Sequence, residues 1–384
     1  MIFSFLALAV ALIWTGLLLG RDFFWLARVA DHAPCPTPAH WPSVIAIVPA
    51  RNEAEVIGST VSSLLAQDYP GDFSVILVDD GSADATADIA RAVAGSLDRL
   101  EVTAAPPLPN GWTGKLWAVS HGIASASTRG TADTRCPDYL WLTDADITHT
   151  PDALRNLVLR AEAGDYVLVS RMALLRCQSF AERALIPAFV FFFQLLYPFR
   201  AVNNRRRTIA AAAGGCMLVS RPALEAAGGI AAIRTALIDD CALGAALKRQ
   251  GNIWLGLSRD TVSIRPYPNF IDVGAMISRS AYAQLGYNPL LLLGTLLGLA
   301  LTYLAPPLLA IFGQGPTRWL GLLAWLIMAA LFQPMLRLYK RSPFWGVVLP
   351  LIASYYGAAT FWSAWQHQRG RGGQWKGRVQ AALR

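Results

Sequence analysis

From residue 43 onwards the sequence alternates between short apolar runs and stretches with helical spacing. Ser43–Pro49 and Phe73–Asp79 are bounded apolar runs that predict strands, and Lys115–Ala126 predicts a helix. Alternating strands and helices build a mainly parallel sheet with helices on both faces, so we expect an α/β domain. In such sheets ligands bind beyond the carboxyl ends of the strands. Further helices are predicted at 53–67, 84–94, from 151 and at 239–250, and further strands at 100–103, 139–144, 166–170 and 214–220.

Apolar residues make up 54% of the chain and charged residues 15%, and the apolar residues gather at its two ends. Residues 1–20 lack charged side chains and are long enough to span a bilayer, which predicts an N-terminal transmembrane anchor. No basic segment precedes this run, so a retained anchor is favoured over a cleaved signal peptide. Residues 289–365 predict a C-terminal transmembrane region. Its candidate helices are 289–312, 319–337 and 344–365, with Pro306 and Pro307 kinking the first.

The order of basic and apolar segments predicts a topology in the inner (cytoplasmic) membrane. Arg21 and Arg28 follow the anchor directly, which places the next domain on the cytoplasmic side. A Pro-rich linker is expected over 21–42 and the catalytic domain over 43–285. If three C-terminal helices span, the basic tail 366–384 falls outside, against the positive-inside rule, so two to three spans are expected.

One apolar stretch inside the soluble domain is too short and too proline-rich for a span. Leu185–Phe199 contains Pro187 and Pro198 and is followed by Arg200 and Arg205–Arg207. This pattern favours an interfacial helix at 185–199, lying on the membrane surface.

The net charge of +8 does not indicate nucleic-acid binding, because the basic residues lie mostly beside apolar segments. Such residues are typical of contacts with anionic lipid headgroups. The five cysteines form no C-x-x-C pair, which gives no support to a zinc site and favours a reducing compartment. No G-x-G-x-x-G follows the first strand, which argues against a dehydrogenase.

Four charged clusters stand at the ends of predicted elements in the soluble domain. They are Pro49-Ala-Arg51-Asn-Glu53, Asp79-Asp80-Gly-Ser-Ala-Asp84, Asp144-Ala-Asp146 and Asp239-Asp240. In an extended chain residues i and i+2 point the same way, so Asp144 and Asp146 can together hold a hard cation such as Mg²⁺. Each cluster alone has an ordinary explanation in turn or helix-end chemistry. Their ordered appearance along a strand–helix pattern favours a single site.

Four further residues attract attention for weaker reasons. His121 and His149 are interpreted as surface or helix residues and not as ligands. Trp112 and Trp117 either border a bound sugar or pack against other residues, and the sequence does not decide between these.

These motifs resemble those of the family-2 glycosyltransferases of the GT-A fold over residues 43–285. The resemblance covers the P-A-R-N-E opening, the V-D-D-G-S-x-D-x-T nucleotide motif, the D-x-D and the acidic pair before a helix. Gly214–Arg221 (G-G-x-x-L-x-R) resembles the acceptor-side strand. With the membrane segments and the Gly111–Ala118 stretch, the chain resembles the hopanoid (hopene)-associated glycosyltransferases. Ceramide glucosyltransferases are more distantly similar.

The resemblance implies a role for each matching residue. Asp240 would be the general base, with Asp239 beside it where many relatives have Glu, and Gly214 and Gly215 would lie on the acceptor side. Asp146 would ligate Mg²⁺ or Mn²⁺, with Asp144 on the ribose and metal side. The residues implied in nucleotide-sugar binding are Pro49, Arg51, Glu53, Asp80, Lys115 and Asp144, with Arg279 near the diphosphate.

The sequence departs from the processive members of the family. Where they carry Q-x-x-R-W, this chain has Met276-Ile-Ser-Arg279-Ser280, which keeps only the arginine. The departure argues against a polymerase and for transfer of a single sugar.

The resulting hypothesis is a membrane-bound, metal-dependent, inverting glycosyltransferase. It would transfer one sugar from a nucleotide-sugar, with UDP-sugars favoured, to a lipid hydroxyl, and a hopanoid is a candidate acceptor. The alternatives are a polyprenyl-phosphate or sphingolipid-type acceptor, and a non-catalytic membrane scaffold that retains a transferase domain. The sequence names neither the sugar nor the lipid.

Overall fold

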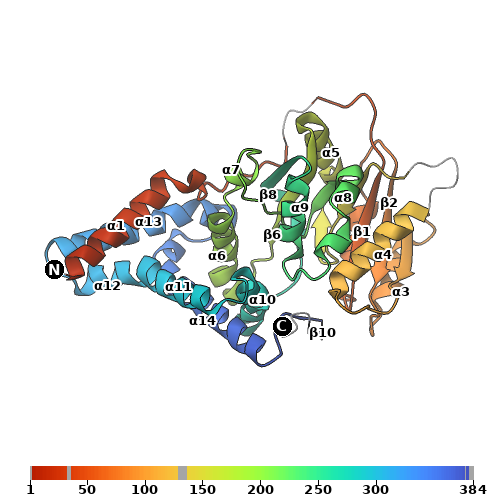
Figure 1. Ribbon diagram of the computed structural model, residues 1–384. Coiled ribbons are helices and arrows are strands. Elements are labelled where there is room, and N and C mark those ends of the chain that lie inside the picture. Colours follow the sequence, from red (N-terminus) through yellow and green to blue (C-terminus); the bar gives the residue numbers. More distant parts are fainter. Residues whose placement is uncertain (1, 33–35, 129–135, 377, 380–384) are drawn as a thin grey trace. The chain divides into compact units, whose positions relative to one another are not determined.

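The structure is a computed structural model that describes residues 2–32, 36–128, 136–376 and 378–379 (Figure 1). The predicted linker residues 33–35 and the end of the predicted tail lie outside these ranges. The chain divides into two compact units. One unit comprises 28–176 and 201–266, and the other comprises 1–27, 177–200 and 267–384.

The unit formed by 28–176 and 201–266 is built on an eight-stranded sheet in the order β3-β2-β1-β4-β7-β6-β8-β5. Its strands are β1 (Val44–Ala50), β2 (Phe73–Asp79), β3 (Leu100–Ala104), β4 (Tyr139–Leu142), β5 (Ile147–His149), β6 (Tyr166–Leu175), β7 (Met217–Ser220) and β8 (Asn252–Ser263). Its helices are α2 (Ile57–Leu65), α3 (Thr86–Ala94), α4 (Gly114–Thr128), α5 (Ala153–Gly164), α8 (Arg221–Ala226), η2 (Ile230–Ile233) and α9 (Asp239–Lys248).

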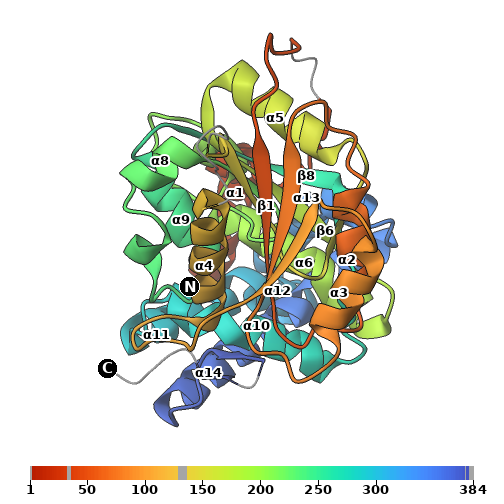
Figure 2. The same cartoon turned by 90° about the vertical axis from the view of Figure 1, so that its right-hand side faces the viewer.

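The α/β fold expected from the sequence is confirmed. Strands β3, β2, β1 and β4 run parallel, as do β6 and β8, whereas β7 and β5 pair antiparallel with their neighbours. Figure 2 shows α4 on one face of the β1–β3 region and α2 and α3 on the other. Strands β5 and β8 were not predicted from the sequence.

The register of the parallel strands sets the position of the loops that follow them. Ala50 of β1 is opposite Asp79 of β2, and Ile47 of β1 is opposite Leu142 of β4. Because these strands run in the same direction, their following residues emerge at one edge of the sheet.

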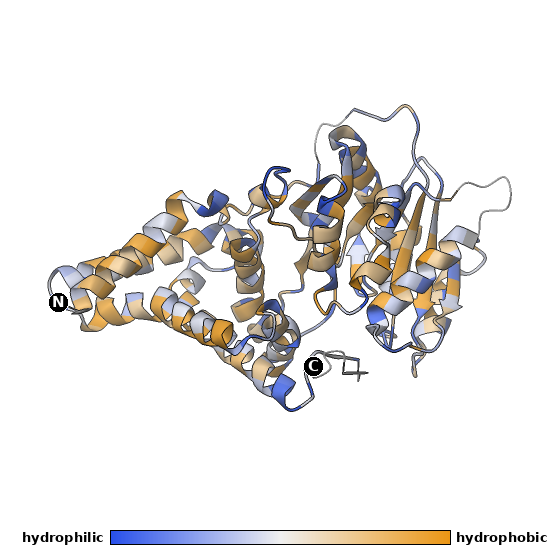
Figure 3. Ribbon diagram, in the orientation of Figure 1, coloured by the Kyte–Doolittle hydropathy of each residue, from blue (hydrophilic) through white to orange (hydrophobic). Residues whose placement is uncertain are grey.

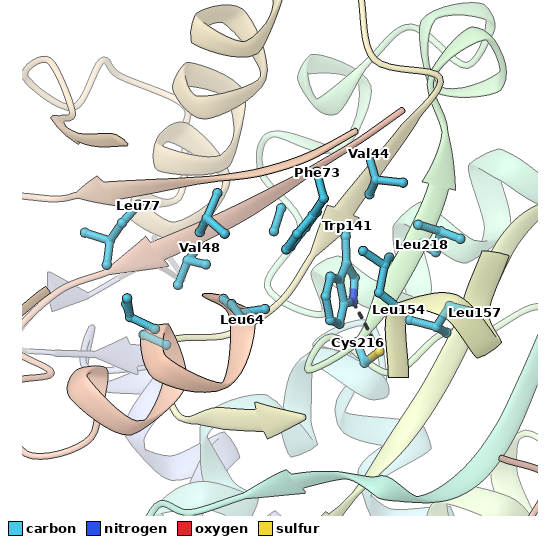
Figure 4. Close-up of a cluster of buried hydrophobic side chains, with 14 of the residues drawn as sticks. Val44, Val48, Leu64, Phe73, Leu77, Trp141, Leu154, Leu157, Cys216 and Leu218 are labelled. Atoms are coloured by element: carbon cyan, nitrogen blue, oxygen red, sulfur yellow. Dashed lines mark hydrogen bonds between the residues drawn. The ribbon is translucent and has the colours of Figure 1, made fainter. Parts of the chain in front are cut away.

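A hydrophobic cluster fills the space on one face of this sheet. Trp141 is fully buried there with Leu64, Leu77, Leu154 and Leu218 (Figure 4). Its indole Nε1 donates to the Cys216 Sγ at 3.4 Å. Burying each large side chain of this kind contributes about 1.5–3 kcal/mol to the stability of the fold. The close-packed cluster therefore holds the strands and their ends in place.

The unit formed by 1–27, 177–200 and 267–384 is helical. Its elements are α1 (Ile2–Leu19), η1 (Arg21–Phe23), α6 (Phe180–Leu196), α10 (Phe270–Gln284), α11 (Pro289–Leu299), η3 (Ala300–Leu304), α12 (Ala305–Phe312), α13 (Pro316–Leu338), η4 (Pro343–Gly346) and α14 (Leu349–Gln368). The short α7 (Phe199–Val202) follows α6, and β9 (Gln374–Trp375) and β10 (Arg378–Val379) pair near the end of the chain. Figure 3 shows hydrophobic residues along most of α1 and α13.

Two described helices are long and apolar enough to cross a membrane, Pro289–Phe312 and Pro316–Leu338. They match the first two predicted C-terminal spans, and Phe3–Leu19 is a shorter apolar helix. A π-helical turn over Ala300–Leu304 precedes Pro306 and Pro307, and the kink predicted at these prolines stays a prediction. The extra residue of a π turn accommodates prolines that cannot donate a backbone hydrogen bond.

The stretch predicted as an interfacial helix forms the larger part of α6. Its N-terminus carries a capping box, in which the Ser179 side chain accepts from the Glu182 N–H and Glu182 accepts in return. Ala184, Leu185 and Phe191 are buried. A position on the membrane surface stays a prediction for this helix.

Candidate active site

The loops that follow β1 and β2 are joined to each other by hydrogen bonds. The Arg51 guanidinium donates to the carbonyl oxygens of Asp80 and Gly81, and Asn52 Oδ1 accepts from the Ala83 N–H at 2.8 Å. Gly81 adopts a positive φ of 66°, which allows the tight turn there. The first two predicted clusters therefore form one structured edge.

A buried carboxylate of the first cluster is linked to the D-x-D turn by an arginine. Arg265 Nη2 donates to Glu53 Oε1 at 2.7 Å, and Arg265 Nε donates to Asp146 Oδ2 at 2.9 Å. The Ser263 hydroxyl donates to the same oxygen of Asp146 at 3.3 Å. Arg265 follows β8 and is not among the residues predicted for the site from the sequence.

Lys115 connects the D-x-D turn with the acidic pair at the start of α9. Its Nζ lies 2.8 Å from Asp144 Oδ1 and 3.0 Å from Asp239 Oδ2. Burial lowers the pKa of Lys115, but the two carboxylates outweigh it and raise the pKa above its usual value. The lysine therefore stays charged and holds two carboxylates, from α9 and from the end of β4, at one point.

Asp240 lies beside this ion pair and is held by backbone donors. Its Oδ2 accepts from the Gly214 N–H at 3.0 Å and its Oδ1 from the Cys241 N–H at 2.7 Å. Burial and the charge of Asp239 raise the pKa of Asp240 to about 6, against the opposing effect of Lys115. A carboxylate with such a pKa is ionised at neutral pH and takes up a proton readily.

A small cavity of about 20 Å³ opens at the same point. It is lined by Pro49, Lys115, Thr143, Asp144, Gly214 and Asp239 together with apolar side chains. Residues from β1, α4, the β4 turn and α9 thus surround one space, which is the strongest candidate for the chemical centre.

Asp144 and Asp146 fit a divalent cation. Lys115 binds one oxygen of Asp144 and Arg265 one oxygen of Asp146, and neither second oxygen has a hydrogen-bond donor among the described residues. The two free oxygens are hard donors of the type that Mg²⁺ and Mn²⁺ accept.

A second group with metal-binding atoms lies elsewhere in this unit. Ligand atoms of His32, Asp152 and Asp260 fall within 4.8 Å of one another. Asp260 already pairs with the buried Arg171 at 3.4 Å, and Asn156 contacts His32 Nδ1 at 3.2 Å. These partners explain the group without an ion.

Most of the residues predicted for the site lie at this edge of the sheet. They are Pro49, Arg51, Glu53, Asp80, Lys115, Asp144, Asp146, Gly214, Gly215, Asp239 and Asp240. Arg279 lies exposed on α10, outside the unit that holds them. A place for Arg279 beside a diphosphate therefore stays a prediction.

The remaining residues of interest are also accounted for. Trp112 and Trp117 pack edge-to-face with ring centroids 5.2 Å apart, and Trp117 Nε1 donates to the Pro106 carbonyl. His121 lies on α4, as expected. The interpretation of His149 as a surface or helix residue is wrong, because it lies on β5 and is buried.

A comparison of the sequence with known protein families gives a match to the part of the chain that holds most of these residues. Residues 45–228 match the family described as "Glycosyl transferase family 2". These residues form a glycosyl transferase family 2 domain. They include β1 from its second residue, the Arg51 and Glu53 that follow it, the D-x-D turn and the Gly214–Gly215 turn. The acidic pair of α9 lies beyond the match.

Curated relatives match a similar part of the chain. A 4,4'-diaponeurosporenoate glycosyltransferase of Staphylococcus aureus is 28% identical over 215 residues, which is 54% of this chain and 52% of the relative. The protein of that name from a second strain is 29% identical over 210 residues, 53% of this chain and 51% of the relative. The match thus spans about half the length of these relatives.

A solved structure is similar to the whole chain in fold. It is a mannosyltransferase from Pyrobaculum calidifontis in complex with GDP-Man and Mn²⁺, with a TM-score of 0.58 and 21% identity. The superposition covers 95% of this chain and 99% of that one. At this identity the likeness concerns the fold alone.

Proposed function

We propose that the protein transfers a single sugar from a nucleotide-sugar to a hydroxyl of a membrane lipid, with inversion at the anomeric carbon. The observation that carries the proposal is the ion pair of Lys115 with both Asp144 and Asp239. It brings the D-x-D of a family 2 domain to the acidic pair that would activate an acceptor.

The chemistry assigned to these residues is a single displacement. The acceptor oxygen attacks the anomeric carbon, Asp240 accepts the hydroxyl proton, and the nucleoside diphosphate leaves with the electrons of the broken bond. The raised pKa of Asp240 suits this role, since it remains ionised yet basic at neutral pH. One displacement inverts the configuration, in contrast to hydrolases that form a glycosyl-enzyme.

The donor is assigned to the edge formed by the β1 and β2 loops. Arg51 and Asp80 would border the base, with Pro49 and Glu53 completing the pocket, and Lys115 would face the diphosphate. Asp144 and Asp146 would hold Mg²⁺ or Mn²⁺, which supplies positive charge for the leaving diphosphate. Arg265 would keep Asp146 in place from the opposite side.

The acceptor is proposed to be lipid, with the Gly214–Gly215 turn on its side of the site. Two described helices that are long and apolar enough to cross a membrane follow the domain, and the curated relatives are named as 4,4'-diaponeurosporenoate glycosyltransferases. A hopanoid is the first acceptor to test, because of the resemblance in sequence. Polyprenyl phosphates and sphingolipids are the alternatives.

Purified full-length protein in nanodiscs tests the proposal directly. It would be incubated with Mn²⁺ or Mg²⁺, lipid extract and radiolabelled UDP-sugars, with GDP-Man included because the solved neighbour binds it. We expect label in the organic phase, and Asp240→Asn to lower the rate of transfer about 10²–10⁴-fold.

The matched control is Asp88→Asn, which removes a carboxylate from the exposed surface of α3. It should transfer sugar like the wild type. If Asp240→Asn and Asp146→Asn variants that fold normally transfer at the wild-type rate, the assigned chemistry is wrong. Donor binding without transfer to any lipid would instead favour the scaffold alternative.

A further inference from the structure

His149 lies on β5 and is 6% exposed, and its imidazole ring contacts three residues on two strands and a turn. Its Nε2 lies 3.0 Å from Thr143 Oγ1, its Nδ1 lies 3.3 Å from Thr261 Oγ1, and its ring packs against Trp141 with centroids 4.5 Å apart. A buried polar ring that is fully used in hydrogen bonds fixes the position of its partners.

The direction of each hydrogen bond follows from the donors and acceptors available. The Thr143 hydroxyl lies 2.9 Å from the Gly215 carbonyl oxygen, which can only accept a hydrogen bond. Thr143 therefore donates its single hydroxyl proton to this carbonyl. Thr143 Oγ1 must therefore accept from His149, which places the imidazole proton on Nε2. Nδ1 then accepts from the Thr261 hydroxyl. The result is one directed chain, Thr261 to His149 to Thr143 to Gly215.

The neutral form of the ring, which this chain requires, is the stable one. Burial and the nearby charge of Arg171 lower the pKa of His149 to about 3. The ring therefore keeps a lone pair on Nδ1 over the whole physiological pH range.

This series of hydrogen bonds ends between the two halves of the candidate active site. Thr143 directly precedes Asp144, and Gly215 directly follows Gly214, whose N–H binds Asp240. Leu142 and Met217 are the last paired residues of β4 and β7, so no ladder holds the two segments together beyond that point. Side-chain hydrogen bonds take over from the backbone there.

A side chain on β4 makes a second connection to the same turn. Trp141, two residues before Thr143, donates from Nε1 to the Cys216 Sγ at 3.4 Å (Figure 4). Residues i and i+2 of a strand share a face, so Trp141 and Thr143 both reach the 215–216 turn. His149 hydrogen-bonds to Thr143 and packs against the Trp141 ring, so it contacts both side chains that reach this turn.

We propose that His149 is a positioning residue, which through Thr143 holds the Gly214–Gly215 turn and its contact to Asp240 at a fixed distance from Asp144. The inference rests on the proposed function, because it concerns the spacing between the donor side and the general base. A misplacement of reacting groups by 1 Å costs about 100-fold in rate, even when the groups themselves are intact.

The first test uses full-length protein in nanodiscs and pairs of variants. Thr143→Val removes the hydroxyl and keeps the shape, and Thr143→Ser restores the hydroxyl. His149→Phe removes both ring nitrogens, and His149→Gln offers a donor and an acceptor in their place. We expect the Val and Phe variants to lose at least about tenfold in kcat with an unchanged KM for the donor, and the Ser and Gln variants to recover most of it.

The second test does not depend on activity. Hydrogen–deuterium exchange of a peptide covering 213–217 should be at least about tenfold faster in Thr143→Val than in wild type, with exchange over β1 unchanged. Equal exchange in the two proteins would overturn the inference, as would a Ser variant as slow in catalysis as the Val variant. If the Val and Phe variants do not fold, Thr261→Val interrupts the same chain one step earlier and should show a smaller effect of the same kind.

The two tests separate this inference from the proposed function. If wild-type protein transfers no sugar while the exchange of 213–217 still responds to Thr143→Val, the proposed function fails and the structural connection stands. If transfer is normal in wild type and in both Val and Phe variants, the connection has no role in positioning.

Discussion

The acid–base behaviour of Asp240 follows from two neighbours of opposite sign. Asp239 precedes it in the chain and raises its pKa, whereas Lys115 lowers it, and burial exceeds both. The raised pKa means that the folded protein binds this proton more tightly than the unfolded chain. Ionisation of Asp240 therefore lowers the free energy of unfolding as the pH rises through about 6. The ionised base needed for the proposed chemistry is thus present at the expense of stability.

The rate of transfer should depend on pH through Asp240. The base acts only when ionised, and at pH 5, one unit below a pKa of about 6, about a tenth of it is ionised. We expect kcat in the wild type to fall on the acid side near pH 6. In Asp239→Asn the neighbouring negative charge is gone, so the acid limb of the kcat profile should move to lower pH.

Measurement of kcat between pH 4.5 and 8 on both proteins checks this. Asp88→Asn, a carboxylate removed from the exposed surface, serves as the control and should leave the limb in place. An acid limb that stays at the same pH in Asp239→Asn would show that another group sets it.

At the level of elements, α4 places Lys115 because the helix lies unusually close to the sheet. A Cβ added at Gly122 would meet Ile47 Cγ2 at 2.7 Å and Val78 Cγ2 at 2.9 Å. Ile47 and Val78 belong to β1 and β2, so the glycine sets the distance between this helix and these strands.

Gly122→Val should therefore push α4 away from the sheet and move Lys115 relative to Asp144. Overpacking of this kind costs about 1–3 kcal/mol of the free energy of unfolding. The thermal midpoint should fall, and kcat should fall with it. Ala124→Val, at an exposed position on the same helix, is the control and should change neither much. Equal midpoints for the two variants would contradict the close approach.

The strand ends and their carboxylates could be predicted from sequence because they combine two local signals. A bounded apolar run predicts a strand, and a carboxylate directly after it lies at the ligand-binding edge of a parallel sheet. Asp144 and Asp146 were found in this way, and Glu53 and Asp80 as well. The sheet beyond β4 was less predictable, since β5 is three residues long and β8 changes from apolar to polar along its length.

Arg265 and His149 could not be found by the same reasoning. Arg265 is 119 residues from Asp146 and 212 residues from Glu53, and Thr261 is 112 residues from His149. No periodicity or spacing in the sequence reports contacts over such separations. His149 also occupies a position that a polar residue seldom takes, and its hydrogen bonds to Thr143 and from Thr261 explain its burial there.

At the scale of the whole molecule, α1 packs within the helical unit, and its role as a transmembrane anchor stays a prediction. Trp14 is fully buried, packs edge-to-face on Tyr303, and donates from Nε1 to the Thr302 carbonyl at 2.8 Å. Thr302 lies in the π-helical turn, where the wider helix leaves a carbonyl free to accept. Residues from the two ends of the chain, in the ranges 1–27 and 267–384, thus fold together in this unit.

The proposed topology places the unit with the active site on the cytoplasmic side, and Cys136 reports on it. Cys136 is exposed in that unit, whereas Cys216 is buried and Cys177 and Cys241 are partly covered. In membrane vesicles of known orientation, a membrane-impermeant maleimide should label the protein strongly in inside-out vesicles and weakly in right-side-out ones. The difference in labelling between wild type and Cys136→Ser gives the part of the signal that comes from Cys136 and separates it from labelling at other cysteines. Strong labelling of Cys136 in sealed right-side-out vesicles would place the unit outside the cell, where nucleotide-sugars are absent. This result would contradict the topology predicted from Arg21 and Arg28 by the positive-inside rule, and it would also contradict the proposed donor.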